Sequence, residues 1–175
     1  AKLRVRSVLL RAAVHVRSGI VDNLAADEHD ALAQIRRFLS YLPSNVWQRT
    51  PRYVNHDPVE RQEQALLDAV PRDSNTGFDM RAIVKLIVDQ DSFFEIGEFY
   101  GPSQICGLAT LAGQPVGILA NDCLHYAGAM TAEAAQKYRR FVEICDTFHV
   151  PVVNFVDQPG FMIGPESEQA LSLIH

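Results

Sequence analysis

Residues 115–164, PVGILANDCLHYAGAMTAEAAQKYRRFVEICDTFHVPVVNFVDQPGFMIG, form the stretch that decides the fold. Pro115–Ala120 and Val152–Val156 are short apolar runs rich in residues that favour β-strands. Between them, Thr131–His149 repeats its apolar residues at helical spacing. A strand, a long helical connection and a second strand predict a right-handed βαβ unit with parallel strands.

Two turns follow the two predicted strands. Residues 127–129 (AGA) precede the helix, and residues 157–160 (DQPG) follow the second strand. The carboxyl ends of parallel strands meet at one edge of a sheet, and sheets of this kind bind ligands at that edge. We therefore expect a candidate site where these two turns come together.

Small side chains around Gly128 leave backbone N–H groups accessible at the point where the helix begins. The positive end of the helix dipole lies there too, so an anion or a developing oxyanion would be stabilised. The simpler interpretation is that small residues only allow a tight turn to pack. Asp157 is expected to hold its loop rather than to act as a general base. Phe161 either lines a flat ligand or belongs to the core.

The composition is that of a globular protein. The 175 residues are 47% apolar and 21% charged, and the net charge of -5 gives no general reason to expect a nucleic-acid partner. No apolar run is long enough to span a membrane, so a cytoplasmic protein is expected. The three cysteines are odd in number and lack CxxC spacing, which predicts buried thiols rather than disulfides or a zinc site.

Other chemistries have little support in the sequence. The six histidines show no HExxH spacing, and the chain contains neither GxSxG nor a GxxxxGK[ST] phosphate loop. A metal ion and a nucleoside triphosphate are therefore not expected. Cys123 and His125 are a conceivable nucleophile and base, but residues two apart rarely have the required geometry, and packing roles are favoured.

The rest of the chain predicts a mixed α/β protein. Apolar spacing predicts a helix capped near Asp22 or Asn23 and ended by Pro43, and Pro-rich residues 43–58 mark a domain boundary. The other expected elements are a weak strand in 14–21, a short helix over 59–70, a helix over Asp79–Val88, a strand over Phe93–Ile96, and a hairpin of Ile105–Leu111 with Pro115–Ala120. On the long helix, the residues expected on or near the buried face are Ala134, Ala135, Tyr138, Phe141, Val142, Cys145 and Phe148, with Lys137 elsewhere.

Several blocks of sequence resemble one known family. RRFLSYLPSNVW, DMRAIVKLIVDQDSFFEI, GLATLAGQPVGILAN, AGAM and RRFVEICDTFHVPVVNFVDQPGFMIG occur in this order. They are similar to the carboxyltransferase (β) subunit of biotin-dependent acyl-CoA carboxylases of the propionyl-/acetyl-CoA type. The resemblance covers residues from about 14 to 170.

The resemblance implies a partial crotonase-like ββα superhelix of the α/β class, built from two related halves. Residues 1–46 are then a remnant of the first half, 47–78 a linker, and 79–175 the beginning of the second half. Residues 1–13 and 171–175 are expected to lie outside the family. Most of the first half is absent, so the chain is expected to be a fragment that is inactive alone.

The same resemblance implies carboxyl transfer from carboxybiotin to the α-carbon of a short acyl-CoA. Biotin is expected on a carrier domain rather than on this chain, and it serves as the base. The coenzyme A thioester is the substrate, and no metal is required. The implied partners are a biotin carboxylase or biotin carrier subunit and further copies of the chain, in a homo-oligomer that is hexameric in the family.

Site residues follow from matching positions in the family. Gly128 and Ala129 match a pair of backbone amides that bind an oxyanion in the second half. The residues expected to border the substrates are Ala127, Thr131, Pro159, Gly160 and Phe161. Thr131 lies near the acyl group, and residues 159–161 lie beside the biotin pocket.

Two alternatives to this function remain open. One is a non-catalytic module that binds the biotin carrier or assists assembly, in which the second-half pocket is retained. The other is a crotonase-type thioester hydrolase or decarboxylase that uses the same amides without biotin. Binding of free biotin without affinity for CoA distinguishes the first, and thioester consumption without biotin distinguishes the second.

Overall fold

The centre of the protein is a four-stranded mixed sheet. The computed structural model describes residues 14–73 and 75–171. The strands lie in the order β1-β2-β3-β4; β2 pairs antiparallel with β1 and β3, and β3 pairs parallel with β4. Their bounds are Phe94–Glu95 (β1), Gln104–Leu111 (β2), Gln114–Asn121 (β3) and Val152–Phe155 (β4). The predicted hairpin and the predicted strand–helix–strand unit with parallel strands are confirmed.

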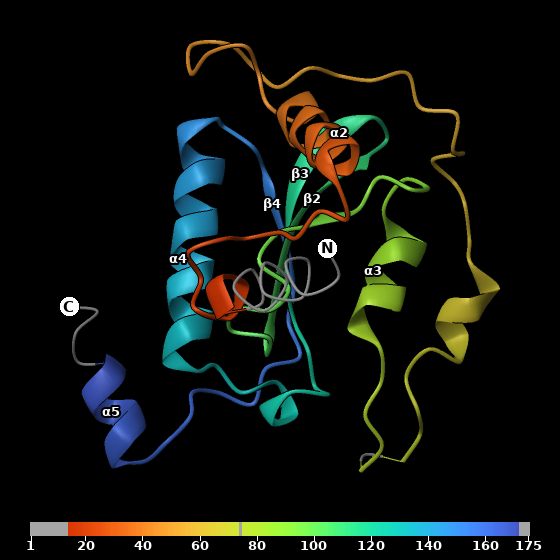
Figure 1. The fold of residues 1–175 in the computed structure, drawn as a ribbon. Coiled ribbons are helices and arrows are strands. Elements are labelled where there is room, and N and C mark those ends of the chain that lie inside the picture. Colours follow the sequence, from red (N-terminus) through yellow and green to blue (C-terminus); the bar gives the residue numbers. More distant parts are fainter. Residues whose placement is uncertain (1–13, 74, 172–175) are drawn as a thin grey trace, which may run out of the picture.

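Helices cover both faces of this sheet. α4 (Ala132–Thr147), which connects β3 to β4, lies on one face, and α3 (Met80–Ile87) lies on the other (Figure 1). Successive side chains of a strand point to opposite faces. In β2, Leu108 accordingly joins the core beneath α4, and Ala109 joins the core beneath α3. Burial on both faces explains why β2 and β3 have nearly continuous apolar sequences.

The buried face of α4 differs from the prediction at two residues. Lys137 was expected away from the sheet, but it is only 5% exposed. Its ammonium group donates to the Gly97 carbonyl at 3.1 Å, which gives the buried charge a partner. Val142 was expected near the buried face, yet it is 42% exposed. The sheet covers a narrower stripe of the helix than its apolar residues suggest.

The amino-terminal part of the described chain departs further from the prediction. Residues 14–17 are helical rather than extended, with the Ser18 N–H donating to the Val14 carbonyl at 3.1 Å. α2 (Glu28–Ser40) is confirmed as a helix, but its cap is Asp27, whose side chain accepts from the Asp30 amide at 2.9 Å. No residue of α2 is fully buried.

Residues 47–78 are mostly irregular. The short helix expected over 59–70 is wrong, because only the 3-10 turn η1 (Gln64–Leu67) forms there. Arg61 holds the preceding segment against α3 instead, donating to the Val88 carbonyl at 2.7 Å. Asp79 caps α3 as predicted, by accepting from the amide of Arg81 at 2.9 Å. The short helix α5 (Pro165–Leu171) follows the second turn. The division at 1–46, 47–78 and 79–175 stays a prediction.

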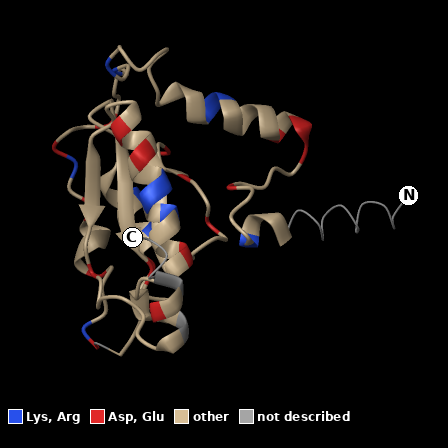
Figure 2. Ribbon diagram, turned by 90° about the vertical axis from the view of Figure 1, so that its left-hand side faces the viewer, with Lys and Arg blue, Asp and Glu red and all other residues tan. Residues whose placement is uncertain are grey.

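Charged residues of both signs are scattered over the molecule (Figure 2). On α4, for example, Arg139 pairs with Glu143 at 2.8 Å, and Arg140 pairs with Asp22 at 3.2 Å. Within the described ranges, no helix has both the length and the apolar composition that crossing a bilayer requires. The expected non-family segments 1–13 and 171–175 lie outside the described residues except for Leu171.

Candidate active site

A buried asparagine joins the carboxyl ends of β3 and β4. Asn121 is the last residue of β3 and is 2% exposed. Its Nδ2 donates to the Asp157 carbonyl at 2.6 Å, and its Oδ1 accepts from the Asp157 N–H at 2.8 Å. One side-chain amide therefore satisfies both backbone groups of Asp157, as a further residue of strand would. We call these paired bonds the Asn121 clamp.

The two predicted turns lie side by side. The Met130 N–H donates to the Gly160 carbonyl at 2.9 Å, and the Met162 N–H donates to the Met130 carbonyl at 2.9 Å. These bonds form a parallel bridge between Met130 and Phe161. The structure thus brings residues 127–131 next to residues 157–162 at the carboxyl edge of the sheet. Phe161 is 62% exposed there, so it is not a core residue of the described chain.

The turn that contains Gly128 has an unusual backbone. Tyr126, Ala127 and Gly128, which form η2, have φ angles of 52°, 51° and 80°. Left-handed conformations cost about 1 kcal/mol or more for a residue with a Cβ, and they persist where the surrounding structure holds them. A Cβ at Gly128 would also lie 2.7 Å from Nδ2 of Asn121 and 3.6 Å from Cδ of Pro159. Only glycine fits this position without strain.

The two amides predicted to bind an oxyanion already have partners. The Gly128 N–H donates to the His125 carbonyl at 2.9 Å, and the Ala129 N–H donates to the Tyr126 carbonyl at 3.0 Å. A ligand oxygen would have to share these hydrogens with the turn, or the turn would have to open. Gly128 is buried and Ala129 half-buried, whereas Ala127 is exposed.

Thr131 has a structural role in the described chain. It is the N-cap of α4, and its hydroxyl accepts from the Ala134 N–H at 3.2 Å. Thr131 is partly exposed. α4 begins at this edge as predicted, and its dipole favours negative charge there.

Asn121 and Gln104 are the residues that sequence reasoning missed. Gln104 is fully buried, and its Nε2 donates to the Gly128 carbonyl at 3.2 Å. The two are register partners at the site end of the β2–β3 hairpin. The available signal was a pair of carboxamides at the ends of two otherwise apolar strands, because buried polar side chains need specific partners.

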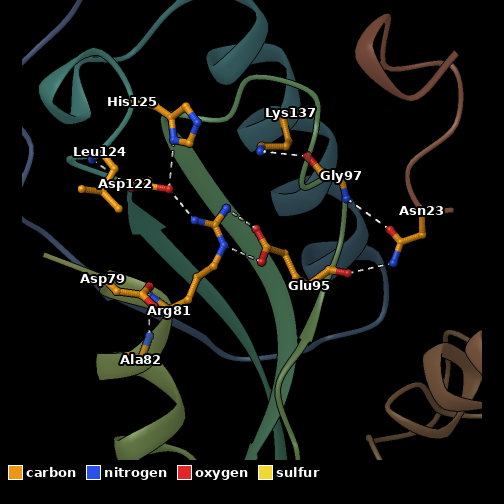
Figure 3. Close-up of polar contacts among 10 residues, drawn as sticks. All are labelled: Asn23, Asp79, Arg81, Ala82, Glu95, Gly97, Asp122, Leu124, His125 and Lys137. Carbon is orange, nitrogen blue, oxygen red and sulfur yellow. Dashed lines mark hydrogen bonds and ion pairs between the residues drawn. The ribbon is translucent and has the colours of Figure 1, made fainter. Parts of the chain in front are cut away.

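A partly buried ionic cluster fixes the start of the same turn (Figure 3). Arg81 of α3 donates through Nε and Nη2 to the Glu95 carboxylate at 2.8 and 2.7 Å, and through Nη1 to Asp122. Asp122 is 1% exposed and also accepts from the Leu124 N–H at 3.0 Å and from Nδ1 of His125 at 3.1 Å. We call Arg81, Glu95 and Asp122 the Arg81 cluster.

Arg81 and Asp122 stabilise each other's charged forms. Burial opposes the charge of Asp122, but hydrogen bonds from Arg81, the Leu124 amide and His125 hold the pKa of its carboxyl below the ordinary value. Burial also opposes the charge of Arg81, and Glu95 with Asp122 outweighs burial and raises the pKa of the guanidinium. Arg81 therefore ties α3 to the end of β3 through the charged pair with Asp122, and its two hydrogen bonds to Glu95 add β1.

The thiols are not arranged for catalysis. Burial raises the pKa of Cys106 to about 12 and that of Cys145 to about 11, which keeps both protonated. Cys123 hydrogen-bonds with the backbone N–H and carbonyl of Phe78, both at 3.3 Å, while His125 is engaged with Asp122. The structure therefore gives no support to a Cys123–His125 nucleophile.

The backbone of Asp157 is held by Asn121, while its own side chain is exposed. The loop is thus fixed from the neighbouring strand rather than by the aspartate itself. In residues 14–73 and 75–171, no group of three or more histidine, cysteine, aspartate or glutamate side chains is placed to hold a metal ion. A metal-free site stays a prediction.

The site lies in a chain that belongs to the carboxyl transferase domain family, whose model matches residues 8–171. The match shows that residues 8–13 and Leu171, which were expected outside the family, are part of it. The mixed sheet with helices on both faces is the crotonase-like α/β fold of the related carboxyltransferases, as predicted from the resemblance.

The relatives found by sequence comparison include carboxylases and a decarboxylase. The chain is 39% identical over 158 residues to the uncharacterized carboxylase YngE of Bacillus subtilis, covering 90% of this chain and 31% of that protein. It is 38% identical over 151 residues to the methylmalonyl-CoA decarboxylase subunit alpha of Veillonella parvula, covering 86% and 30%. The propionyl-CoA carboxylase beta chain of Saccharopolyspora erythraea is 34% identical, covering 87% and 29%.

Solved structures that superpose on the chain also come from carboxyl-transferring enzymes. A transcarboxylase 12S structure with methylmalonyl-coenzyme A bound superposes with a TM-score of 0.87 at 31% identity, covering 93% of this chain and 31% of that one. A single-chain, multi-domain long-chain acyl-CoA carboxylase superposes with a TM-score of 0.79 at 31% identity, covering 93% and 16%. The chain thus spans less than a third of the length of these relatives.

Proposed function

We propose that this chain is part of a carboxyltransferase that moves a carboxyl group from carboxybiotin to the α-carbon of a short acyl-CoA. One observation carries the proposal: in a member of the carboxyl transferase family, the two turns meet through the paired backbone bonds of Met130. The names of the relatives, which include a propionyl-CoA carboxylase beta chain, support a thioester substrate.

The proposed reaction breaks the N–C bond of carboxybiotin and forms a C–C bond at the α-carbon of the thioester. The α-proton passes to the biotin ureido nitrogen, so no side-chain base is needed. Negative charge develops on the thioester oxygen and on the ureido oxygen, and the amino end of α4 favours charge at this edge. Gly128 and Ala129 would stabilise that charge by sharing their N–H groups between the turn and the ligand.

The proposed substrate surroundings are those implied by the family resemblance. Thr131 would border the acyl group, and the exposed ring of Phe161 would lie beside biotin. The residues that complete these surroundings are Ala127, Pro159 and Gly160. Biotin would arrive on a carrier from a biotin carboxylase or carrier subunit, as the names of biotin-dependent relatives suggest.

The proposed assembly is a homo-oligomer. The related transcarboxylase 12S structure describes a hexamer assembly, which supports a ring of copies for the whole protein. The chain would supply the end of one crotonase-like half and the beginning of the next, with the acyl-CoA surface contributed by sequence related to the first half.

A second candidate is the reverse transfer, from a carboxylated acyl-CoA to biotin. The relative named methylmalonyl-CoA decarboxylase subunit alpha, at 38% identity, specifically favours it. The same edge of the sheet would serve, because the transferred group and the two oxygens that gain charge are the same in both directions.

The test measures carboxylation of acetyl-, propionyl- and butyryl-CoA with carboxylated biotin. It compares the purified chain with a fusion that adds, ahead of residue 1 and after residue 175, the flanking segments of a carboxylase beta chain. We expect only the fusion to be active. Activity of the 175-residue chain alone would place the thioester on residues described here as structural. Loss of the carboxyl group from methylmalonyl-CoA with free biotin as acceptor would favour the reverse transfer.

A fusion that folds and binds CoA but transfers no carboxyl group in either direction would refute the proposal. Binding of biotin without CoA would then support the non-catalytic module, and biotin-independent thioester loss would support the crotonase-type enzyme.

A further inference from the structure

Gln104 is a buried carboxamide at the first position of β2. Its Nε2 donates to the Gly128 carbonyl at 3.2 Å, so it links the interior of the sheet to the turn at the edge. Its Oε1 is buried and has no hydrogen-bond partner in the described part of the chain. An apolar side chain of equal length would fill the space without burying an unpaired acceptor. Packing alone therefore does not explain a glutamine here.

The turn that Gln104 contacts needs support from outside. Tyr126 and Ala127 both have a Cβ and both have a positive φ, an arrangement that persists only where neighbouring groups hold it. Asn121 restricts the turn sterically, since its Nδ2 lies 2.7 Å from the position that a Cβ on Gly128 would occupy. Gln104 adds a directional hydrogen bond from a rigid central strand.

We propose that Gln104 is a positioning residue that orients the Gly128–Ala129 peptide and thereby fixes the direction of the Ala129 N–H, which donates to the Tyr126 carbonyl at 3.0 Å and which a ligand oxygen at the candidate site would share. A peptide bond is planar and trans, so its carbonyl oxygen and its N–H point in opposite directions. A side chain that holds the Gly128 oxygen on the sheet side therefore turns the Ala129 hydrogen away from the sheet. The inference rests on the proposed function, in which this N–H meets developing negative charge.

The first test uses the 175-residue chain without substrate. Gln104→Met keeps the length of the side chain and removes the donor, and hydrogen exchange is measured at the Gly128 and Ala129 amides. We expect exchange at both to rise about tenfold, which corresponds to the loss of one hydrogen bond. Exchange at Leu108 and Ile118, in the interior of the sheet, should not change.

Gln114→Met is the matched control. Gln114 is a partly buried glutamine at the opposite end of the same hairpin, where its Nε2 donates to the Thr50 hydroxyl at 2.7 Å. This variant should leave exchange at Gly128 and Ala129 unchanged. If Gln104→Met does not fold, Gln104→Leu, which also lacks the donor and buries no charge, serves in its place.

The second test measures carboxyl transfer by the active fusion. A positioning role predicts that Gln104→Met lowers kcat about tenfold while KM for the acyl-CoA stays the same. An unsubstituted fusion that folds and binds CoA but transfers no carboxyl group in either direction would refute the proposed function, and the exchange result would still decide the role of Gln104. Unchanged exchange at Gly128 and Ala129, equal acceleration at Leu108, or an undiminished kcat would each overturn the inference.

Discussion

Gly128 combines two separate requirements for glycine, a φ of 80° and close contact with Nδ2 of Asn121. Gly128→Ala is expected to lower the free energy of unfolding by about 1–3 kcal/mol, measured by urea denaturation, because both requirements are violated together. Gly164→Ala is the control. Gly164 has a φ of 137° but open space where a Cβ would lie. This variant therefore loses stability only through the strained backbone conformation and not through a steric contact. Equal losses in the two variants would show that the contact with Asn121 is unimportant.

The Asn121 clamp depends on one donor as well as one acceptor. Asn121→Asp keeps the acceptor for the Asp157 N–H but sets a carboxylate against the Asp157 carbonyl. We expect a loss of about 1–3 kcal/mol at neutral pH and faster proteolysis of the 157–162 loop, followed by limited digestion. Asn154→Asp, at an exposed position of β4, should be nearly neutral because the Asn154 Oδ1 accepts from the Tyr138 hydroxyl at 3.3 Å and an aspartate keeps this acceptor. A stable Asn121→Asp variant with a protected loop would contradict this role of the clamp.

At the scale of elements, the Arg81 cluster connects α3 and β1 to the end of β3. Arg81→Met leaves the buried carboxylate of Asp122 without its cation and is expected to cost about 3 kcal/mol, measured by urea unfolding. Arg139→Met is the control. Arg139 forms a similar pair with Glu143 on α4, but both side chains are more than half exposed, so the effect should be below about 1 kcal/mol.

The same cluster predicts a pH dependence of stability. The pKa of Asp122 is lower in the folded chain than its unfolded value of about 3.9, so the folded state binds fewer protons. The charged Asp122 carboxylate therefore contributes to the free energy of unfolding above about pH 4. This contribution is lost as the pH falls through the lowered pKa of the folded state. In Arg81→Met, burial without the cation should raise the pKa of Asp122 and reverse its contribution. If acidification lowered the free energy of unfolding equally in the unsubstituted chain and in Arg81→Met, this account would be contradicted.

Lys137 makes α4 sensitive to alkaline pH. Burial lowers the pKa of its ammonium group in the folded chain, whereas the unfolded value is about 10.4. Between these two values the unfolded state binds more protons, so the contribution of Lys137 to stability rises with pH. Lys137→Met should remove this rise in urea unfolding, and Lys85→Met, at an exposed position of α3, should keep it. Identical alkaline profiles for the two variants would exclude the effect.

At the scale of the whole molecule, α2 buries little of its apolar stripe. It has no fully buried residue, and Leu32, Ile35 and Leu39 are 46%, 54% and 58% exposed. We expect its amides to exchange at least about tenfold faster than those of β2 and β3, because its opening exposes little additional apolar surface. Hydrogen exchange followed by peptide mass measurement tests this. Protection of α2 equal to that of the sheet would show that it unfolds only with the core.

Much of the architecture could be predicted from local sequence. The apolar run at Pro115–Ala120 and the helical spacing over Thr131–His149 led to a strand and a crossover helix, and the structure contains both. The edge where the two turns meet followed from the parallel pairing of β3 and β4. These features depend on periodicity and on short connections, which a single sequence records.

The remaining features depend on partners far along the chain. The burial of Lys137 could not be predicted, because its partner is the Gly97 carbonyl in a loop before β2. Asn121 was missed for the same reason, since its partner is the backbone of Asp157. The helix expected over 59–70 failed because the contacts of Arg61 with α3 outweigh a weak local preference.

The Asn121 clamp joins residues 36 positions apart, and α4 lies entirely within the closed segment. Neighbouring strands such as β2 and β3 can associate early, because only a short turn separates them. The clamp can form only after the chain has completed the crossover and β4 has aligned beside β3, contacts of high sequence separation that form slowly. The edge that holds the candidate site is therefore among the last parts of the protein to appear during folding, and a chain arrested before that step has the hairpin without the candidate site.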